Sequence, residues 1–486
     1  MSSTLPAMSE SSWSPLACPV LIAGEEVSTA KLLEVRYPWD GSLTGAVCMA
    51  GREHLERAIE AANAPRETPP DRYARHQVLR RAAGLLAERR DEFAALITRE
   101  TGLALHEAKY ETSRSSDVLE FAAMEALKDD GQIFSCDISP QGKPRKIFTT
   151  RMPLSLVGAI TPFNHPLNQV AHKLAPAIAA GAPVILKPSE KTPLTAIRFA
   201  SLLYEAGLPG WMLSVVVGDL DEVIAPLVSD PRVELLTFTG SVEIGKKISV
   251  TAGYKKLCLE LGGNSPLIVL DDADVELAAK LAAEGSFRNS GQRCTAVKRL
   301  LVQRGILEAF TKRFVEVAAT YTCGDPEDPA TRVGTVIDEA AAKVLEERVK
   351  LAVEDGAKVL LGGGRRGALM EPTVIANVSR ESEVVVKESF GPLAPIVPID
   401  DLDDAIRYYN SGNFGLSSAV VTNDLTLALK ACKELKTGTT NVNEVPGYRI
   451  ESSPFGGIKD SGLGIKEGVV EATKLMTHLK TFSLPW

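Results

Sequence analysis

The sequence predicts an α/β protein with two parallel sheets, and two observations support that prediction. From Leu154 to about Gly253, short β-branched runs alternate with amphipathic stretches, as in LSLVGAITP, NQVAHKLAPAIAAG and PVILKPS. A second alternation runs from Ser265 to about Val445. Strands that alternate with helices form βαβ units, whose parallel sheets are covered by helices and bind ligands beyond the carboxyl ends of their strands. The two stretches therefore predict two α/β domains with a cleft between them.

Two further segments have their own patterns. From Arg52 onwards, apolar residues recur at helical spacing, with a break expected at Thr101-Gly102. Residues 131–153 alternate apolar and polar positions around the turn signal Pro140-Gln141-Gly142. This alternation predicts a protruding β-hairpin, a candidate for subunit contacts.

Size and composition exclude several classes of protein. The chain has 486 residues, of which 45% are hydrophobic and 24% charged, as expected of a folded protein of two to four domains. Its 54 Lys and Arg against 62 Asp and Glu give a net charge of −8, which argues against binding to nucleic acid. The longest apolar stretch, 174–186, is too short to span a membrane, and residues 1–20 lack the basic and apolar regions of a signal peptide. We therefore expect a cytoplasmic protein with no membrane partner.

The familiar nucleotide motifs do not fit. Residues 362–367 satisfy GxGxxG, but the following ALMEPTVI is typical of a strand, whereas a dinucleotide fingerprint requires a helix there. Residues 240–247 nearly match a P-loop, but Lys247 stands where Ser or Thr would bind magnesium. The segment FTGS, 238–241, still ends a strand and begins a helix, so its backbone N–H groups could receive a diphosphate.

Three residues are candidates for chemistry. Cys294, in SGQRCT, lies beside a cation that would lower its pKa, although most cysteines are inert core residues. Glu260, in LELGG, is a possible base at a strand end, where glutamates are also common without a function. Asn164, in TPFNHP, could donate to an oxyanion or simply form a turn. The seven cysteines contain no CxxC pair and the six histidines no HExxH, so we predict neither a disulfide framework nor a metal.

Together these segments resemble the aldehyde dehydrogenase superfamily over essentially the whole chain. The matching motifs, in family order, are TPFNHP, KPSEKTPLTA, FTGS, LELGG, SGQRCT, ESFGP and SPFGGIKDSG. The resemblance implies a variant Rossmann NAD-binding domain, 1–130 and 154–262, and an α/β catalytic domain, 263–452. It also implies a small β oligomerisation element, 131–153 and 470–486, and hence a homodimer or homotetramer.

The resemblance also implies catalytic roles. Cys294 matches the nucleophile, Glu260 the base that activates water, and Asn164 the side-chain half of the oxyanion hole. A base for water favours hydrolysis over transfer to coenzyme A. Lys173 resembles a proton-relay lysine, but Lys466 replaces the acidic residue common after the SGxG turn, so Lys173 is expected to lack its usual partner.

For the cofactor, the resemblance implies a nicotinamide dinucleotide. Lys187 and Glu190 match the adenine-ribose site. A carboxylate at Glu190 would accept from a ribose 2′-OH and repel a 2′-phosphate, which favours NAD, with NADP as an alternative because Lys191 is adjacent. The implied cofactor-binding residues are Thr161, Pro162, Phe163, Lys187, Glu190, Gly240, Ser241, Glu388 and Phe390.

Within the superfamily, the segments KIFTTR, NSGQRCTAVKR and EVPGYRIESSPFGGIKDSG resemble the branch that oxidises phosphonoacetaldehyde to phosphonoacetate. The substrate residues that this resemblance implies are Arg114, His165, Arg293 and Arg449. Several cations suit a phosphonate rather than an apolar aldehyde, and Arg293 could also lower the pKa of Cys294. Phosphonoformaldehyde, lactaldehyde and succinate semialdehyde stay open as substrates, and a catalytically silent binding protein is the alternative from another class.

Overall fold

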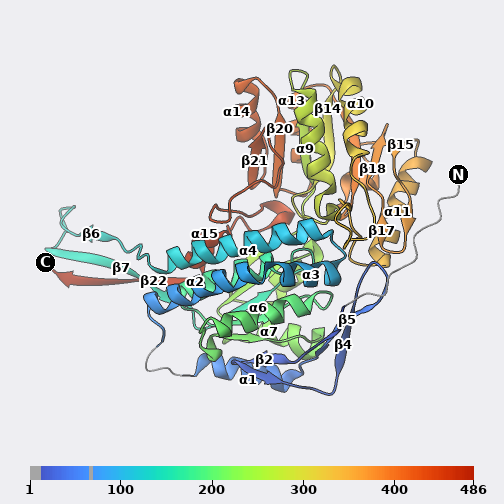
Figure 1. Ribbon diagram of the computed structural model, residues 1–486. Helices are drawn as coiled ribbons and strands as arrows, with labels where there is room; N and C mark the ends of the chain where they lie inside the picture. The colour runs from blue at the N-terminus through green and yellow to red at the C-terminus, as the bar shows by residue number, and fades with distance from the viewer. Residues whose placement is uncertain (1–12, 65–68) are drawn as a thin grey trace.

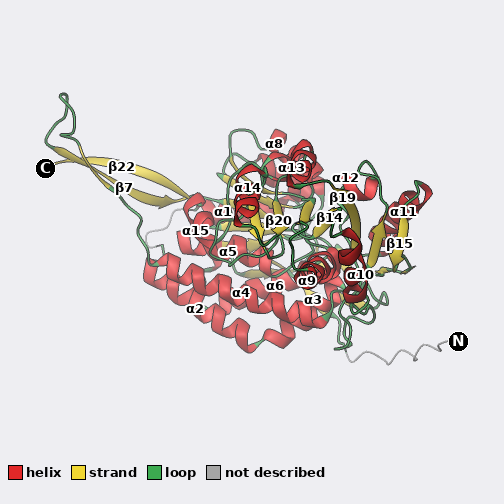
Figure 2. Cartoon of the chain, turned by 90° about the horizontal axis from the view of Figure 1, so that it is seen from above, coloured by secondary structure: helices red, strands yellow, loops and turns green. Residues whose placement is uncertain are grey.

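The computed structural model describes residues 13–64 and 69–486, and it confirms the α/β class (Figure 1). Two lobes, each built on a seven-stranded sheet, lie one above the other, and a thin arm projects from one side (Figures 1 and 2). The expectation that residues 1–20 are not a signal peptide falls partly on residues 1–12, which lie outside the described residues. No helix within the described ranges combines the length and apolar character needed to cross a membrane.

The first lobe is built on a sheet that reads, from edge to edge, β12 (Lys256–Glu260), β11 (Leu235–Thr239), β8 (Val157–Ile160), β9 (Val184–Lys187), β10 (Leu213–Val215), β2 (Val20–Ile22) and β3 (Glu25–Val27). The strands from β12 to β10 are parallel, and β2 and β3 are antiparallel. Because parallel strands end at one edge, this topology brings the segments after β8, β9, β11 and β12 together.

Helices cover both faces of this sheet. One face packs against α2 (Arg72–Glu88), α3 (Arg90–Thr101), α4 (Leu105–Ala126), α5 (Asn168–Ala180) and α6 (Pro193–Glu205). The other packs against α1 (Arg52–Asn63), α7 (Ala225–Ser229) and α8 (Val242–Thr251). Neighbouring residues of one strand take opposite faces: Val184 belongs to the first core and Ile185 to the second. The predicted break after Thr101 is confirmed, since Gly102 caps α3 with a φ of 73°.

Two buried glutamates from these helices cap other helices. Glu111 of α4 accepts from the backbone N–H groups of Leu167 and Asn168 at the start of α5, at 2.8 and 2.9 Å. Glu100 of α3 does the same for α6 through Leu194 and Thr195. A helix start leaves its first N–H groups without partners, and a carboxylate satisfies them well. The covering helices thereby fix where α5 and α6 begin.

The N-terminal part differs from the sequence expectation. Strands β1 (Leu16–Cys18), β4 (Leu32–Arg36) and β5 (Leu43–Cys48) form a separate sheet, and β2 and β3 also precede Arg52. These strands have three to six residues, too few for a clear alternation of apolar and polar positions.

The second lobe is built on a sheet with the order β15 (Lys358–Leu361), β18 (Thr373–Ala376), β19 (Leu393–Ile399), β14 (Val297–Gln303), β13 (Ser265–Val269), β20 (Ser417–Val421) and β21 (Thr439–Val442). Only the β15–β18 pair of this sheet is antiparallel. One face packs on α9 (Val275–Phe287) and α10 (Leu307–Ala318). The other packs on α11 (Glu339–Glu354), α12 (Glu383–Val386), α13 (Leu402–Ser411) and α14 (Leu425–Glu434). The short strands β16 (Arg365–Arg366) and β17 (Leu369–Met370) form a hairpin directly after the three glycines at 362–364.

The arm is a three-stranded antiparallel sheet. Strands β6 (Ile133–Ser135) and β7 (Arg145–Pro153) pair as the hairpin expected for 131–153, and Gly142 donates to the carbonyl of Ser139 in the connecting turn. The C-terminal strand β22 (Thr477–Pro485) follows α15 (Val469–Leu475) and pairs with the whole of β7. Figure 2 shows that this arm extends well away from both lobes.

Candidate active site

The strand ends of the first sheet and the loop before β14 enclose a cavity of about 410 Å³. Several residues predicted for the site line it, namely Pro162, Phe163, Asn164, Gly240, Ser241, Glu260, Cys294, Glu388 and Phe390. They come from both lobes, so the cavity lies in the cleft that two α/β units predict. Thr161, Lys173, Lys187, Glu190, Arg114, His165, Arg293 and Arg449 are not among its lining residues.

The loop that presents Cys294 has an unusual backbone. Asn289, Ser290 and Gly291 all have positive φ, at 57°, 51° and 70°. Such a conformation costs about 1–3 kcal/mol at a non-glycine residue and persists only where the surroundings hold it. Asn289 is held by its side chain, which donates to the carbonyl of Asn164 at 3.1 Å. A Cβ at Gly291 would collide with the carbonyl of Gly391, which explains the glycine in SGQRCT.

Burial raises the pKa of the Cys294 thiol to about 11, and the charges of Lys298 and Arg449 oppose this rise. Lys298, four residues after the cysteine, is 1% exposed and donates to the carbonyl of Arg293 at 2.7 Å. Arg293 also interacts favourably with the Cys294 thiolate, less strongly than Lys298 does. Its guanidinium donates to the carbonyls of Glu284 and Gly285 at the end of α9, at 3.0 and 2.8 Å.

Asn164 lies at the carboxyl end of β8, in the segment that leads to α5. Its side-chain amide donates to the carbonyl of Gln292 at 2.7 Å, across the base of the cysteine loop. An amide nitrogen has two hydrogens, so one donor is left for a ligand. Glu111 fixes the other end of the segment by capping α5.

Glu260 is the last residue of β12 and is buried, and neither of its carboxylate oxygens has a hydrogen-bond partner among the described residues. Burial raises its pKa well above the ordinary value, and the neighbouring charge of Glu467 adds to this effect. Gly456 leaves room for the carboxylate, because a Cβ there would come within 2.6 Å of Glu260 Oε1. A buried carboxyl group with a raised pKa and no partner is suited to proton transfer near neutral pH.

The prediction that Lys173 lacks an acidic partner is wrong. Its ammonium group, fully buried on α5, lies 2.7 Å from Glu467 Oε1 and 2.7 Å from the hydroxyl of Thr237. The partner carboxylate stands one residue after Lys466, which instead donates to the carbonyls of Gly438 and Gly456. Burial raises the pKa of Glu467, but the charge and hydrogen bond of Lys173 outweigh it and hold the pKa below its ordinary value.

Glu388 lines the cavity and contacts the segment between β12 and β13. Its Oε1 accepts from the N–H of Gly263 at 3.0 Å and pairs with Lys298 at 3.1 Å. Phe390, two residues later, meets Phe163 edge to face at 5.9 Å between ring centroids. The glycines of LELGG are required here, because a Cβ at Gly262 would collide with the Glu388 carboxylate.

The other predicted cofactor residues lie at the strand ends of the first sheet. Ser241 caps α8, the helix that begins at the cavity, and accepts from the N–H of Ile244 at 3.4 Å. The hydroxyl of Thr239 beside it is buried and has no partner among the described residues. Lys187, at the end of β9, forms an ion pair with Glu190. These donors and the carboxylate of Glu190 fit a dinucleotide with its diphosphate at α8 and an adenine ribose beyond β9.

Two of the predicted substrate arginines share one carboxylate. Glu451 lies 2.5 Å from Arg114 Nε and 3.8 Å from Arg449 Nη2. His165 contacts another buried carboxylate, Glu111, at 3.3 Å. Arg293 lies apart from this group, at the end of α9.

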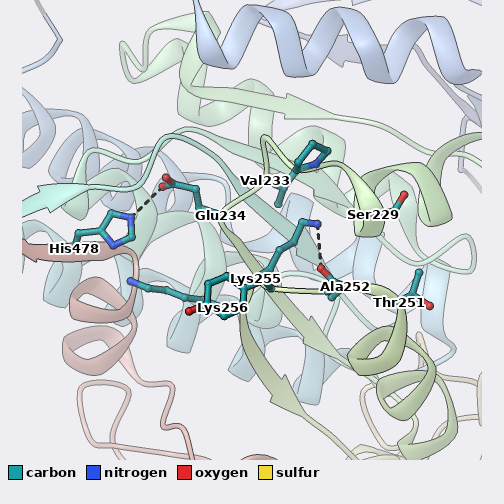
Figure 3. A pocket seen from close by; sticks show the side chains of 11 residues that line it. Ser229, Val233, Glu234, Thr251, Ala252, Lys255, Lys256 and His478 are labelled. Carbon is teal, nitrogen blue, oxygen red and sulfur yellow. Dashed lines mark hydrogen bonds and ion pairs between the residues drawn. The ribbon is translucent and has the colours of Figure 1, made fainter.

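Two other features of the described residues lie outside this site. No group of three or more His, Cys, Asp or Glu in ranges 13–64 and 69–486 could hold a metal ion. A hollow of about 770 Å³ lies beside the root of the arm, where His478 pairs with Glu234 at 3.4 Å (Figure 3). Lys256, which also lines it, donates to the carbonyl of Thr477. None of the predicted site residues lines it.

Three residues of the site were not predicted. Lys298 has a sequence signal, since two cations interrupt the otherwise apolar run VKRLLV, and a buried cation in a strand needs a charged partner. Glu467 has a weaker sequence signal, because it is a carboxylate one position after Lys466, where the family pattern has its acidic residue. Glu451 has none, because its partners Arg114 and His172 are about 300 residues away along the chain.

The chain is similar to known proteins over almost its whole length. The model of the aldehyde dehydrogenase family matches residues 25–482. The chain is 39% identical over 457 residues to a 3-sulfolactaldehyde dehydrogenase of Priestia aryabhattai, covering 94% of this chain and 96% of that protein. It is 38% identical over 413 residues to a sulfoacetaldehyde dehydrogenase of Neptuniibacter caesariensis, covering 84% and 89%.

Solved structures extend the agreement to the fold. Aldehyde dehydrogenase 21 from Physcomitrella patens, in complex with the reaction product succinate, superposes with a TM-score of 0.94 at 34% identity, covering 97% of this chain and 99% of that one. The NADP-dependent glyceraldehyde-3-phosphate dehydrogenase from Bacillus halodurans, complexed with NADP, gives 0.93 at 33% identity, with the same coverage. The chain therefore belongs to the aldehyde dehydrogenase family.

Proposed function

We propose that this aldehyde dehydrogenase oxidises a small aldehyde that carries an oxoanion, with phosphonoacetaldehyde as substrate and phosphonoacetate as product. The observation that carries the proposal is the meeting of Cys294, Asn164 and Glu260 at one cavity. These three groups supply a nucleophile, an oxyanion donor and a base, which together oxidise an aldehyde through a covalent thioester.

The first step is attack of the Cys294 thiolate on the aldehyde carbon. The positive charges of Lys298 and Arg449 favour the thiolate against its burial. The carbonyl oxygen becomes an oxyanion, which accepts from the free N–H of the Asn164 amide and from the backbone N–H of Cys294. Since Asn164 is fixed through Gln292 and Asn289, this donor is in place before the substrate arrives.

The last step is hydrolysis of the thioester. Glu260 has no competing partner among the described residues, so its carboxylate is available to accept a proton from an attacking water. The water adds to the thioester carbon, the C–S bond breaks, and the acid leaves with Cys294 restored. The availability of this base supports a hydrolytic enzyme over one that transfers its acyl group to coenzyme A.

A nicotinamide dinucleotide, when bound, accepts the hydride that leaves the former aldehyde carbon. We assign its diphosphate to Gly240 and Ser241 at the start of α8, its adenine ribose to Lys187 and Glu190, and its nicotinamide end to Glu388 with Phe390. The Thr161–Phe163 segment forms the adjoining wall. The carboxylate of Glu190 favours NAD over NADP, because it would repel a 2′-phosphate.

The oxoanion is assigned to the arginines. The side chain of Arg449 is 12% exposed, and its Nη1 is buried with no hydrogen-bond partner among the described residues. A guanidinium with an unused buried donor is suited to an anionic ligand, which it can bind through two parallel hydrogen bonds. Arg114, His165 and Arg293 are the further candidates for this contact.

A sulfonate-bearing aldehyde is the second candidate. The relatives named as sulfolactaldehyde and sulfoacetaldehyde dehydrogenases, at 39% and 38% identity, favour it. Sulfonate and phosphonate groups are both tetrahedral oxoanions, so the same arginines could bind either. The sequence segments shared with the phosphonoacetaldehyde-oxidising branch favour the phosphonate.

The test measures NADH formation with phosphonoacetaldehyde, sulfoacetaldehyde, succinate semialdehyde, lactaldehyde and acetaldehyde. We expect kcat/KM for phosphonoacetaldehyde to exceed that for acetaldehyde about 100-fold, a difference of about 2.7 kcal/mol in transition-state binding. The highest value with sulfoacetaldehyde would select the second candidate, and equal values throughout would contradict an anion site. Cys294→Ala should abolish acid formation with every substrate.

A further inference from the structure

One buried carboxylate organises a cluster of charged side chains beside the candidate active site. Glu451 is 4% exposed, and its Oε1 lies 2.5 Å from Arg114 Nε. Its Oε2 lies 2.5 Å from His172 Nε2 and 3.8 Å from Arg449 Nη2. Arg114 belongs to α4 and His172 to α5, so Glu451 connects two helices with the segment after β21.

His172 takes part in this cluster as a neutral donor. Burial lowers the pKa of its ring, which is 2% exposed. A neutral imidazole carries one N–H, and the 2.5 Å contact with Glu451 places that hydrogen on Nε2. The hydrogen bond from His172 and the charges of Arg449 and Arg114 overcome the effect of burial and hold the pKa of Glu451 well below its ordinary range.

Arg449 is held on two sides. The face of its guanidinium lies 4.4 Å from the ring centroid of Phe455, and its Nη2 lies 3.8 Å from Glu451 Oε2. Its Nη1 is buried without a partner among the described residues. Arg449 lies near the reacting groups, because Phe455 precedes Gly456, which abuts Glu260 Oε1, and Gly447, two residues before Arg449, abuts Thr295 beside Cys294.

We propose that Glu451 and His172 are positioning residues that select anionic substrates, because they fix the guanidinium of Arg449, with Arg114 beside it, toward the oxoanion of the aldehyde. This inference rests on the proposed function. Two arginines face one carboxylate in the cluster, so one positive charge is left for the substrate. Binding an oxoanion through two parallel hydrogen bonds requires a fixed guanidinium, which the carboxylate and Phe455 supply.

The test compares an anionic with a neutral aldehyde, sulfoacetaldehyde with propionaldehyde, in the holoenzyme. Glu451→Gln keeps the size of the side chain but leaves the two arginines to repel each other. We expect KM for the anionic aldehyde to rise about tenfold or more, as for a lost charge-assisted contact, with a much smaller change in kcat/KM for the neutral aldehyde. Glu451→Asp keeps the charge, so KM for the anionic aldehyde should rise less than in Glu451→Gln. His172→Phe should also raise this KM selectively, by a smaller factor than Glu451→Gln.

Asp404→Asn is the matched control, because it breaks another partly buried ion pair of the second lobe, between Arg380 and Asp404 at 2.6 Å. It should lower thermal stability without changing the ratio of the two KM values. An unchanged or lower KM for the anionic aldehyde in Glu451→Gln, or an equal loss with both aldehydes, would overturn the positioning role. A wild-type enzyme with no preference for anionic aldehydes would overturn the proposed function itself, before any variant is made.

Discussion

At the scale of single residues, the site combines a thiol and a carboxyl group that burial pushes toward their neutral forms. Burial raises the pKa of Cys294 to about 11 and that of Glu260 well above its ordinary value. The charges of Lys298 and Arg449 oppose the rise in the pKa of the thiol. Glu260 has no hydrogen-bond partner among the described residues. Both groups therefore keep a raised proton affinity, and the two cations limit that rise at the nucleophile.

The state of Glu260 predicts a dependence of the hydrolytic step on pH. A carboxyl group with a raised pKa is protonated, and inactive as a base, below that pKa. We therefore expect kcat to fall as the pH decreases through a value well above the usual pKa of about 4.3 for glutamate. A pH profile of kcat with an acidic limb near or below 4.3 would contradict a raised pKa.

Replacing Glu260 separates the two halves of the reaction. In Glu260→Gln, thioester formation should continue while hydrolysis slows about 10²–10⁴-fold, the usual contribution of a general base. Rapid mixing should then show a burst of about one NADH per subunit, followed by a slow steady rate. The same steady rate as the wild type, without a burst, would mean that another group activates the water.

At the scale of structural elements, a buried ion pair ties α5 to the segment before α15. Lys173 is fully buried against Glu467, and Lys173→Met would leave an unpaired buried carboxylate, at a cost of about 3–5 kcal/mol. We expect the double variant with Glu467→Leu to be more stable than Lys173→Met alone. Urea denaturation of both single variants and the double variant measures the coupling, and additive losses would show that the two groups are independent.

The same pair makes a contribution to stability that depends on pH. Because the pKa of Glu467 is lowered in the folded state, its contribution is fully present above the unfolded pKa of about 4.3 and is lost as the pH falls through the folded pKa. The wild type should therefore lose more stability than the double variant when the pH is lowered below about 4.3.

The strained loop before Cys294 gives another prediction at this scale. Gly291→Ala adds a Cβ at a φ of 70° against the carbonyl of Gly391, so we expect a loss of stability above 2 kcal/mol and a large loss of kcat. Gly367→Ala is the control, since its φ of 58° is similar but a Cβ there meets nothing within 4 Å. It should cost about 1 kcal/mol, with kcat unchanged. Equal effects of the two substitutions would show that the contact with Gly391 is unimportant.

These elements also show what a sequence can predict. Alternating strands and helices identify the two sheets, and the strand-end motifs identify Asn164, Glu260 and Cys294, because parallel strands converge at one edge. The pairing of side chains is different. The Glu467 partner of Lys173 and the Glu451 partner of Arg114 depend on distances between segments roughly 300 residues apart, which no local pattern encodes.

At the scale of the whole molecule, the arm has a surface that a single chain does not cover. Its strand β22 pairs with β7 along nine residues, yet apolar side chains of the arm stay exposed, among them Ile133, Phe134, Leu479, Leu484 and Trp486. A narrow three-stranded sheet that extends from the body has little core of its own, and exposed apolar patches of this kind mark interaction surfaces. We expect the arm to pack on a second copy of the chain, in a dimer or tetramer.

Deleting residues 478–486 removes most of β22 and leaves β7 with a free edge. We expect this variant to sediment as a smaller species than the full chain in analytical ultracentrifugation, because the covered apolar surface of the assembly is lost. Leu425→Ser is the control, since this side chain is 72% exposed on α14, far along the chain from the arm, and its loss should leave the assembly unchanged. A double substitution, Leu479→Ser with Leu484→Ser, tests the surface while keeping the strand. If both arm variants keep the mass of the full-length assembly, the subunits meet through another face of the molecule.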